Sequence, residues 1–165
     1  MEERIACEWI GDVASGVGAW SCPGSWSAAL HLARLIESDE SDPAVVRLVE
    51  RLCFDRPTAR VFCERVQQWV RENVPFVRES VELFQSPDTL LASSCGGDCD
   101  CHARLVASML AAAGVRFRVV FFGGESGATH VAVQALCGVC AFWLETTLPA
   151  AFGEHPFAAH ARIHK

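Results

Sequence analysis

Cys99 is the residue of this chain whose setting most favours covalent chemistry. It lies in the stretch 96–102, Gly-Gly-Asp-Cys-Asp-Cys-His, which leads directly into the apolar stretch 103–113 and stops at Gly114. Two glycines allow a tight turn, an aspartate caps free backbone N–H groups, and glycine commonly follows a helix end. The pattern predicts a helix that begins near Cys99. The free N–H groups of a helix start favour a thiolate over a thiol, so this position suits a nucleophile.

A histidine and a carboxylate are predicted to lie side by side further along the chain. A two-residue hairpin turn at Cys137-Gly138 would place His130 opposite Glu145 on neighbouring strands. Directly opposed residues have Cβ atoms about 4.5–5.5 Å apart on one face, which is near enough for a carboxylate to orient an imidazole. The strands themselves are predicted from three segments rich in β-branched and aromatic residues, 116–122, 129–136 and 139–145.

Together these residues are the parts of a Cys-His-acid triad. His130 would deprotonate Cys99 and later protonate the leaving group, while Glu145 would hold the ring and stabilise its charged form. N–H groups at the helix start around Cys99 would bind the oxyanion that forms when a thiolate attacks a carbonyl. The reaction class is acyl transfer through a thioester.

At these residues the sequence resembles the transglutaminase-like superfamily, in particular short stand-alone domains of bacterial and phage genomes. The similar segments occur in order over roughly residues 43–149, and their combination is far more specific than any one of them. They are Trp-Val-Arg-Glu-Asn-Val-Pro-Phe-Val at 69–77, Gly-Asp-Cys-Asp at 97–100 with the Ala- and Leu-rich helix that follows and Gly-Val at 114–115, Arg-Val-Val at 118–120, His-Val-Ala-Val at 130–133 and Trp-Leu-Glu-Thr-Thr at 143–147.

The resemblance implies a papain-like α+β fold, with N-terminal helices and a catalytic helix packed on an antiparallel sheet. It implies Cys99, His130 and an acid as the triad and requires no cofactor. The family usually has aspartate, often followed by proline, where this chain has Glu145 followed by threonine. Gln85 and Asp98 are candidates for supporting the oxyanion, Gln85 because similar phage-type domains carry a comparable segment there.

Zinc binding is the alternative interpretation of the cysteine-rich stretch. Zinc needs four ligands at tetrahedral spacing, but the first group of candidates lacks a repeated separation of two to four residues. A zinc-stabilised binding module would use a set drawn from Cys95, Cys99, Cys101, His102, Cys137 and Cys140.

Composition bounds the remaining choices. The chain has 165 residues, is 51% hydrophobic and carries a formal net charge of −6, which is typical of one globular domain. An acidic chain without basic runs is not expected to bind nucleic acid. No apolar stretch approaches the ~20 residues that a membrane span needs, and the start lacks the layout of a signal peptide. We therefore expect a cytoplasmic protein, without membrane contacts, whose nine cysteines are mostly reduced.

The rest of the chain must position the triad. Residues 1–24 are rich in glycine without sustained periodicity and predict an irregular extension, so that residues 25–165 form a single domain. Helical periodicity predicts helices over 25–37, from Pro43 to about 52 and from near 56–58 to about 73, with the acidic run 37–42 as a solvated linker and 74–95 irregular. Residues 152–165, which carry His155, His160 and His164, are expected to form a solvated or loosely docked tail, with a metal-binding tail as the alternative.

The function expected from these residues is hydrolysis of a peptide or amide bond in a protein or peptide substrate. Transfer to an amine, as in a protein-glutamine transglutaminase, and deamidation use the same thioester and remain alternatives. A catalytically silent domain that binds or assembles with a partner is the alternative from another class, beside the zinc module.

Overall fold

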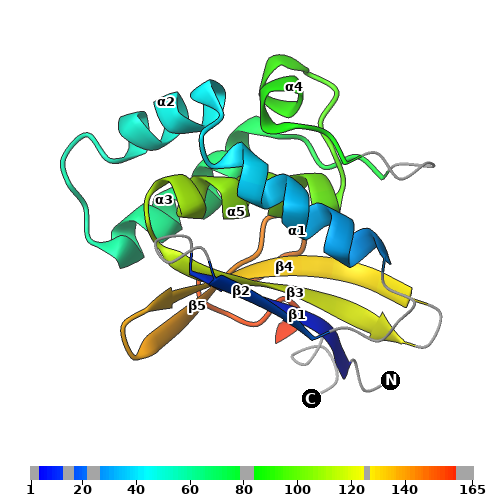
Figure 1. The fold of residues 1–165 in the computed structure, drawn as a ribbon. Coiled ribbons are helices and arrows are strands. Elements are labelled where there is room, and N and C mark those ends of the chain that lie inside the picture. Colours follow the sequence, from blue (N-terminus) through cyan, green and yellow to red (C-terminus); the bar gives the residue numbers. More distant parts are fainter. Residues whose placement is uncertain (1–3, 13–16, 22–26, 79–83, 125–126, 159–165) are drawn as a thin grey trace.

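The computed structural model describes residues 4–12, 17–21, 27–78, 84–124 and 127–158. The described helices are α1 (Ser27–Asp39), α2 (Pro43–Leu52), α3 (Ala59–Asn73), α4 (Pro87–Ala92) and α5 (Cys99–Ala112). The strands are β1 (Arg4–Asp12), β2 (Val17–Ser21), β3 (Arg116–Gly124), β4 (Gly127–Cys137) and β5 (Cys140–Leu144). Figure 1 shows the helices covering one face of an antiparallel sheet, which confirms the expected α+β class.

Helix α5 lies at the centre of this arrangement. Every residue from Asp100 to Ala111 is buried, with the sheet on one side and other helices on the opposite side. Most of these residues are apolar, apart from Asp100, His102, Arg104 and Ser108, and a helix of this kind is stable when it is enclosed by other elements. Its side chains Leu105, Met109 and Leu110 are fully buried and belong to the main core. The helix that begins at Cys99 is therefore held by the whole domain.

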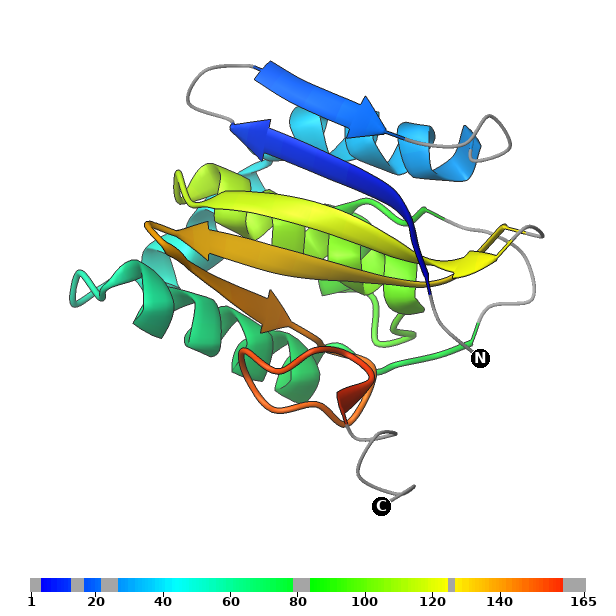
Figure 2. The same cartoon turned by 90° about the horizontal axis from the view of Figure 1, so that it is seen from below.

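The N-terminal residues form two strands of the sheet, and the expectation of an irregular extension over 1–24 is wrong for the described part. Strand β1 pairs with β2 and with β3, so the sheet order is β2-β1-β3-β4-β5 (Figure 2). The β1 register against β3 shifts between Ile5 and Cys7. This segment forms a strand because it pairs with β3, which lies more than one hundred residues away in the sequence. Such distant pairing cannot be predicted from the local periodicity of residues 1–24.

The β4–β5 hairpin turns one residue later than predicted. Cys137 pairs with Cys140, and the turn residues are Gly138 and Val139. Gly138 has φ of 64°, as the first central residue of a primed two-residue turn requires. The predicted Cys137-Gly138 turn would have put a cysteine in that position. The pairing is thus shifted by two residues along β5, and a shift of two leaves every side chain on its original face.

The acidic run 37–42 is not a solvated linker. Helix α1 continues to Asp39, whose buried carboxylate accepts hydrogen bonds from the Arg104 guanidinium on α5 at 2.5 and 2.9 Å. Arg104 also donates to the Phe84 carbonyl at 2.6 Å. Asp42 behaves as expected, because its side chain caps α2 through the Ala44 N–H at 2.7 Å.

The segment expected to be irregular over 74–95 contains the short helix α4 within its described part. Proline at the first position starts α4, and Leu90 is buried against the core. Phe76 forms a parallel bridge with Gly97, which ties this segment to the start of α5. Among the described helices, none has the length and apolarity needed to cross a bilayer.

Candidate active site

Close packing at residues 96–97 explains the two glycines before α5. Gly96 has φ of 75°, and a Cβ there would lie 2.1 Å from the Pro75 carbonyl oxygen. A Cβ on Gly97 would lie 2.6 Å from the Cys101 Cβ. The Gly97 N–H donates to the Pro75 carbonyl at 3.1 Å, and its carbonyl accepts from the Val77 N–H at 3.0 Å. These two hydrogen bonds hold the turn that precedes Cys99 against residues 75–77.

Cys99 is the first residue of α5, as the sequence predicts, with Asp98 as the helix cap. Its sulfur lies at β4, where the Val131 N–H acts on it as a hydrogen-bond donor and favours the thiolate. Burial has the larger effect and, with the negative charge of Asp98, raises the pKa of the Cys99 thiol to about 12. The expectation that the helix start alone yields a thiolate is therefore wrong for this structure, in which Cys99 rests as a thiol.

Asp98→Asn is expected to accelerate alkylation of Cys99 by iodoacetamide. Asparagine keeps the helix cap, but loss of the negative charge lowers the Cys99 pKa and enlarges its thiolate fraction. A charge effect of ~0.3–1 kcal/mol corresponds to a roughly two- to five-fold faster rate. Because the pKa lies above the assay range, both proteins should label faster as the pH rises from 7 to 10. Peptide mass spectrometry gives the rates, with exposed Cys95 as internal reference; a rate already at its plateau at acidic pH would contradict this account.

His130 and Glu145 are in direct contact. The His130 Nε2 lies 2.7 Å from the Glu145 Oε2, and the two residues are only 8% and 1% exposed. Extending the observed register by one residue past Leu144 places Glu145 opposite Ala132, so His130 is its diagonal neighbour on the same face. Diagonal neighbours are about 7–8 Å apart at Cα, a separation that a long side chain can span. Glutamate suits this position because its extra methylene reaches across the diagonal.

Glu145 is held by donors on both of its oxygens. The Oε1 atom accepts from the Thr147 N–H at 2.6 Å, the Thr147 hydroxyl at 3.0 Å and the Leu148 N–H at 2.9 Å. Burial acts to raise the pKa of Glu145, but the hydrogen bond and charge of His130, with these N–H groups, outweigh it and lower the pKa. The carboxylate is therefore ionised beside the imidazole at neutral pH.

Helix α3 supports the Glu145 loop from outside. The buried Gln67 Oε1 accepts the Glu145 backbone N–H at 3.2 Å. One turn further along α3, Arg71 donates to the carbonyls of Leu148 and Ala150 at 2.8 and 2.5 Å. Gln67 and Arg71 lie at i and i+4, so they share one face of the helix. The spacing alone indicates that Gln67 and Arg71 act on one surface. It does not indicate that they bind the Glu145 loop, because that loop lies more than seventy residues further along the sequence.

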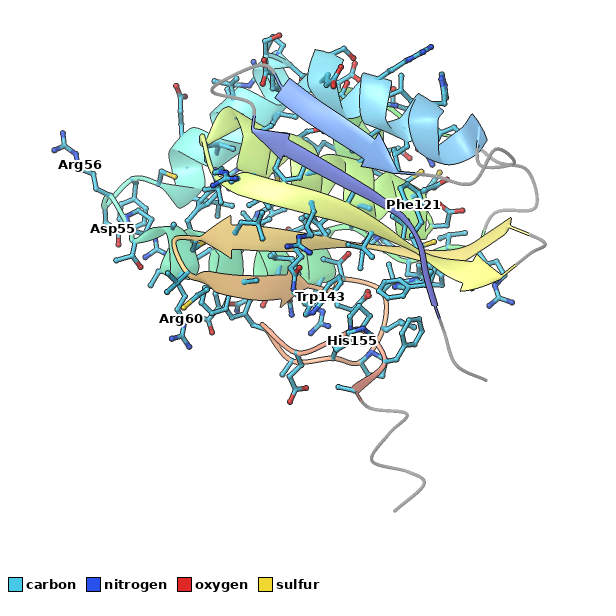
Figure 3. All side chains as sticks on the ribbon, turned by 60° about the horizontal axis from the view of Figure 1, so that its bottom comes forward. Asp55, Arg56, Arg60, Phe121, Trp143 and His155 are labelled. Atoms are coloured by element: carbon cyan, nitrogen blue, oxygen red, sulfur yellow. The ribbon has the colours of Figure 1, made fainter. Side chains whose placement is uncertain are left out.

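The His130 ring is enclosed by aromatic side chains. Phe122, directly opposite on β3, stacks on it with 6.1 Å between ring centroids, and Phe157 meets it edge-on at 5.5 Å. Figure 3 shows His155 beside Trp143 of β5, a pair whose ring centroids are 5.2 Å apart. The described start of the C-terminal stretch is thus packed beside the site, unlike the loosely docked tail expected; His160 and His164 lie outside the described residues.

His102 is a buried positioning group one turn after Cys99. Its Nδ1 lies 3.1 Å from the Thr146 hydroxyl and its Nε2 lies 3.5 Å from the Pro75 carbonyl oxygen. Burial lowers its pKa, so the ring is neutral. A carbonyl only accepts, so we infer the Nε2–H tautomer, whose Nδ1 accepts from Thr146. His102 therefore connects the Glu145 loop to the Pro75 turn.

The side-chain amide of Gln85 donates to the Gly96 carbonyl at 3.1 Å. This contact brings Gln85 to the turn that leads into Cys99, near the region where an oxyanion would form. A hydrogen bond between Cys99 and His130 is absent among the described residues; the contact of the Cys99 sulfur is with the N–H of Val131, the next residue after His130 on β4.

The structure does not gather the residues of the zinc interpretation. Within the described ranges, the sole group of three potential ligand atoms within 4.8 Å of one another is Asp98, Asp100 and Cys101. Cys137 and Cys140 lie at the far end of the β4–β5 hairpin, and Cys95 is exposed. Four-ligand zinc coordination would require a different arrangement of these residues.

Comparison with known proteins agrees with the geometry. The family model described as the transglutaminase-like superfamily matches residues 50–146, which is more than half of the chain and includes Cys99, His130 and Glu145. No curated protein and no solved structure matches significantly. The superfamily is one of papain-like cysteine enzymes with an α+β fold, as observed here. On the extent of this match and on its fold, the chain belongs to the transglutaminase-like superfamily.

Proposed function

We propose that the chain catalyses acyl transfer through a thioester on Cys99, with hydrolysis of a peptide or amide bond as the overall reaction. The observation that carries the proposal is the buried 2.7 Å hydrogen bond between His130 and Glu145. It lies next to Val131, whose N–H acts on the Cys99 sulfur. A nucleophile, a base and an orienting carboxylate at one place are the parts that covalent catalysis requires.

In the first step, the Cys99 sulfur attacks the substrate carbonyl carbon while its proton passes to His130. The receiving atom is Nδ1, because Nε2 is bonded to Glu145. Glu145 stabilises the imidazolium that results. Because Cys99 rests as a thiol, proton removal accompanies substrate attack and does not precede it. N–H groups at the start of α5, other than the Cys101 N–H that Asp98 caps, stabilise the oxyanion.

The tetrahedral intermediate then collapses. The carbon–nitrogen bond breaks, His130 gives its proton to the departing amine, and the acyl group stays on Cys99 as a thioester. Water attacks the thioester carbonyl with His130 as base, which releases a carboxylic acid and restores the thiol. An amine in place of water would give transamidation, and attack on a glutamine side chain followed by water would give deamidation.

A mixture of many peptides in ¹⁸O-labelled water tests the proposal across a wide range of candidate substrates at once. We expect the wild type to produce peptides whose new carboxyl groups carry one ¹⁸O atom, detected by mass spectrometry. Cys99→Ala should abolish these products, and His130→Ala should slow them by about 10²–10⁴-fold, the usual contribution of a positioned general base. Cys95→Ala, at an exposed cysteine on the same segment, is the matched control and should retain full activity.

The same assay distinguishes the alternatives. Label confined to glutamine side chains identifies deamidation, and incorporation of an added primary amine identifies transamidation. If folded wild-type protein yields no product that depends on Cys99, the proposed catalysis is wrong and the fold serves as a binding or assembly module.

A further inference from the structure

The end of the β4–β5 hairpin carries two cysteines that the proposed catalysis does not use. Cys137 and Cys140 are register partners on either side of the turn Gly138–Val139. Opposed residues of an antiparallel pair project from the same face, so the two side chains lie next to each other. The pair exists only because of the observed turn; the turn predicted from sequence would have put Cys140 opposite Ala135.

A third thiol lies against this pair from α3. Cys63 is fully buried and donates a hydrogen bond to the sulfur of half-buried Cys137, whereas Cys140 is exposed. Arg60, one turn before Cys63, has its guanidinium carbon 5.4 Å from the centroid of the Phe142 ring, so the start of α3 packs on this hairpin. Figure 3 shows Arg60 at this end of the molecule. The three sulfurs thus run from the core to the solvent.

We propose that Cys137 and Cys140 are a redox-active pair that forms a reversible disulfide across the hairpin turn. Directly paired residues in an antiparallel ladder have Cα atoms about 4.5–5.5 Å apart, within the range of about 4.4–6.8 Å that disulfides occupy. Solvent reaches Cys140, so it is the sulfur that a small oxidant meets first. The disulfide would lock the register of the two strands that lead to His130 and Glu145. The proposal does not depend on the proposed catalysis.

The oxidant is a small-molecule disulfide such as oxidised glutathione. The Cys140 thiolate attacks one of its sulfur atoms, forming a mixed disulfide and releasing one glutathione thiolate. The Cys137 thiolate then attacks the Cys140 sulfur and releases the second glutathione. The protein loses two electrons and two protons, and one oxidised glutathione becomes two reduced molecules. Reduced glutathione in excess reverses both steps.

Equilibration of the full chain in glutathione buffers of graded oxidised-to-reduced ratio tests this pair. After acid quenching and alkylation of free thiols, trypsin releases residues 119–162 as one peptide and residues 61–65, with Cys63, as another. We expect oxidation to remove two hydrogen atoms from peptide 119–162 and to block its alkylation, while Cys63 and Cys99 remain alkylated. Cys140→Ser should abolish this change, and Cys95→Ser, at another exposed cysteine, should leave it intact.

Three results would overturn the proposal. One is stable glutathionylation of Cys140 without closure, and another is a cross-link between peptides 61–65 and 119–162, which would identify Cys63 as the partner. The third is alkylation of both Cys137 and Cys140 at every ratio.

Discussion

Glu145→Gln is expected to reduce the rate of Cys99-dependent peptide hydrolysis by about 10²–10⁴-fold with the fold retained. In the wild type, Oε1 accepts the Thr147 and Leu148 N–H groups and Oε2 accepts from His130. Glutamine has one oxygen for these two positions. The two backbone N–H groups cannot reverse, so the oxygen faces them and the amide NH₂ faces His130. The Nε2 atom must then accept, which moves the ring proton to Nδ1 and blocks the base.

The ¹⁸O assay measures this loss, and ¹⁵N chemical shifts of the His130 ring report the tautomer directly. Thr147→Val is the matched control, because it removes only the hydroxyl bond to Oε1 at 3.0 Å and leaves the carboxylate charge in place. It should cost far less activity than Glu145→Gln. A Glu145→Gln protein with activity within about threefold of wild type would exclude Glu145 as the orienting residue, since an orienting partner contributes far more.

The acid stability of the same two proteins adds an independent check. A carboxyl group whose pKa is lowered on folding stabilises the native state above its unfolded pKa, and this contribution is lost as the pH falls through the folded value. The Glu145 pKa is lowered in this way. The wild type should therefore lose more stability in acid than Glu145→Gln.

Asp39→Asn is expected to lower the free energy of unfolding by about 3–5 kcal/mol, the usual cost of removing one partner from a buried ion pair. The side chains of Arg104 and Asp39 are 6% and 8% exposed, so loss of the carboxylate leaves the guanidinium charge buried without its counter-ion. Urea unfolding followed by circular dichroism gives the change. Joint replacement of Asp39 by leucine and Arg104 by methionine should recover most of it, because no buried charge then remains.

The exposed pair of Arg65 and Asp55 offers the matched control for this experiment. Arg65 donates to both Asp55 oxygens, at 2.6 and 2.8 Å, but Asp55 is exposed and Arg65 is only half-buried. Asp55→Asn should hardly change the free energy of unfolding, because water screens the charges of an exposed ion pair. The buried charges of Arg104 and Asp39 are not screened in this way. If Asp39→Asn lowers the free energy of unfolding by less than about 1 kcal/mol, the buried pair contributes no more than an exposed pair does, and the prediction is wrong.

The start of α5 is the feature that the sequence predicts best, because its determinants are local. Cap, helix and terminating glycine lie within twenty residues, and the structure has Asp98 as cap and Cys99 as first helical residue. The need for glycine at 96 has a second cause that is not local, because the Pro75 carbonyl packs so closely there that a side chain would clash. At Gly97 the clash would be with Cys101, which lies four residues further along the same stretch.

The contact between His130 and Glu145 was predictable despite the misplaced turn. Side-chain direction along a strand has a period of two, so the two-residue difference in register kept both groups on one face. The glutamate side chain then reached the diagonal neighbour. An error of one residue in register would have put Glu145 on the opposite face of the sheet.

By itself, then, the sequence determined the α+β class, the helix start at Cys99 and the side of the sheet that His130 and Glu145 share, since propensity, capping and strand alternation depend on near neighbours. Tertiary structure decided what depends on distant ones. Strand β1 is organised by β3, the Arg104 charge is balanced by Asp39, and Phe157 packs on His130. It also decided the protonation of Cys99, because burial by the surrounding fold outweighs the local field of the helix start.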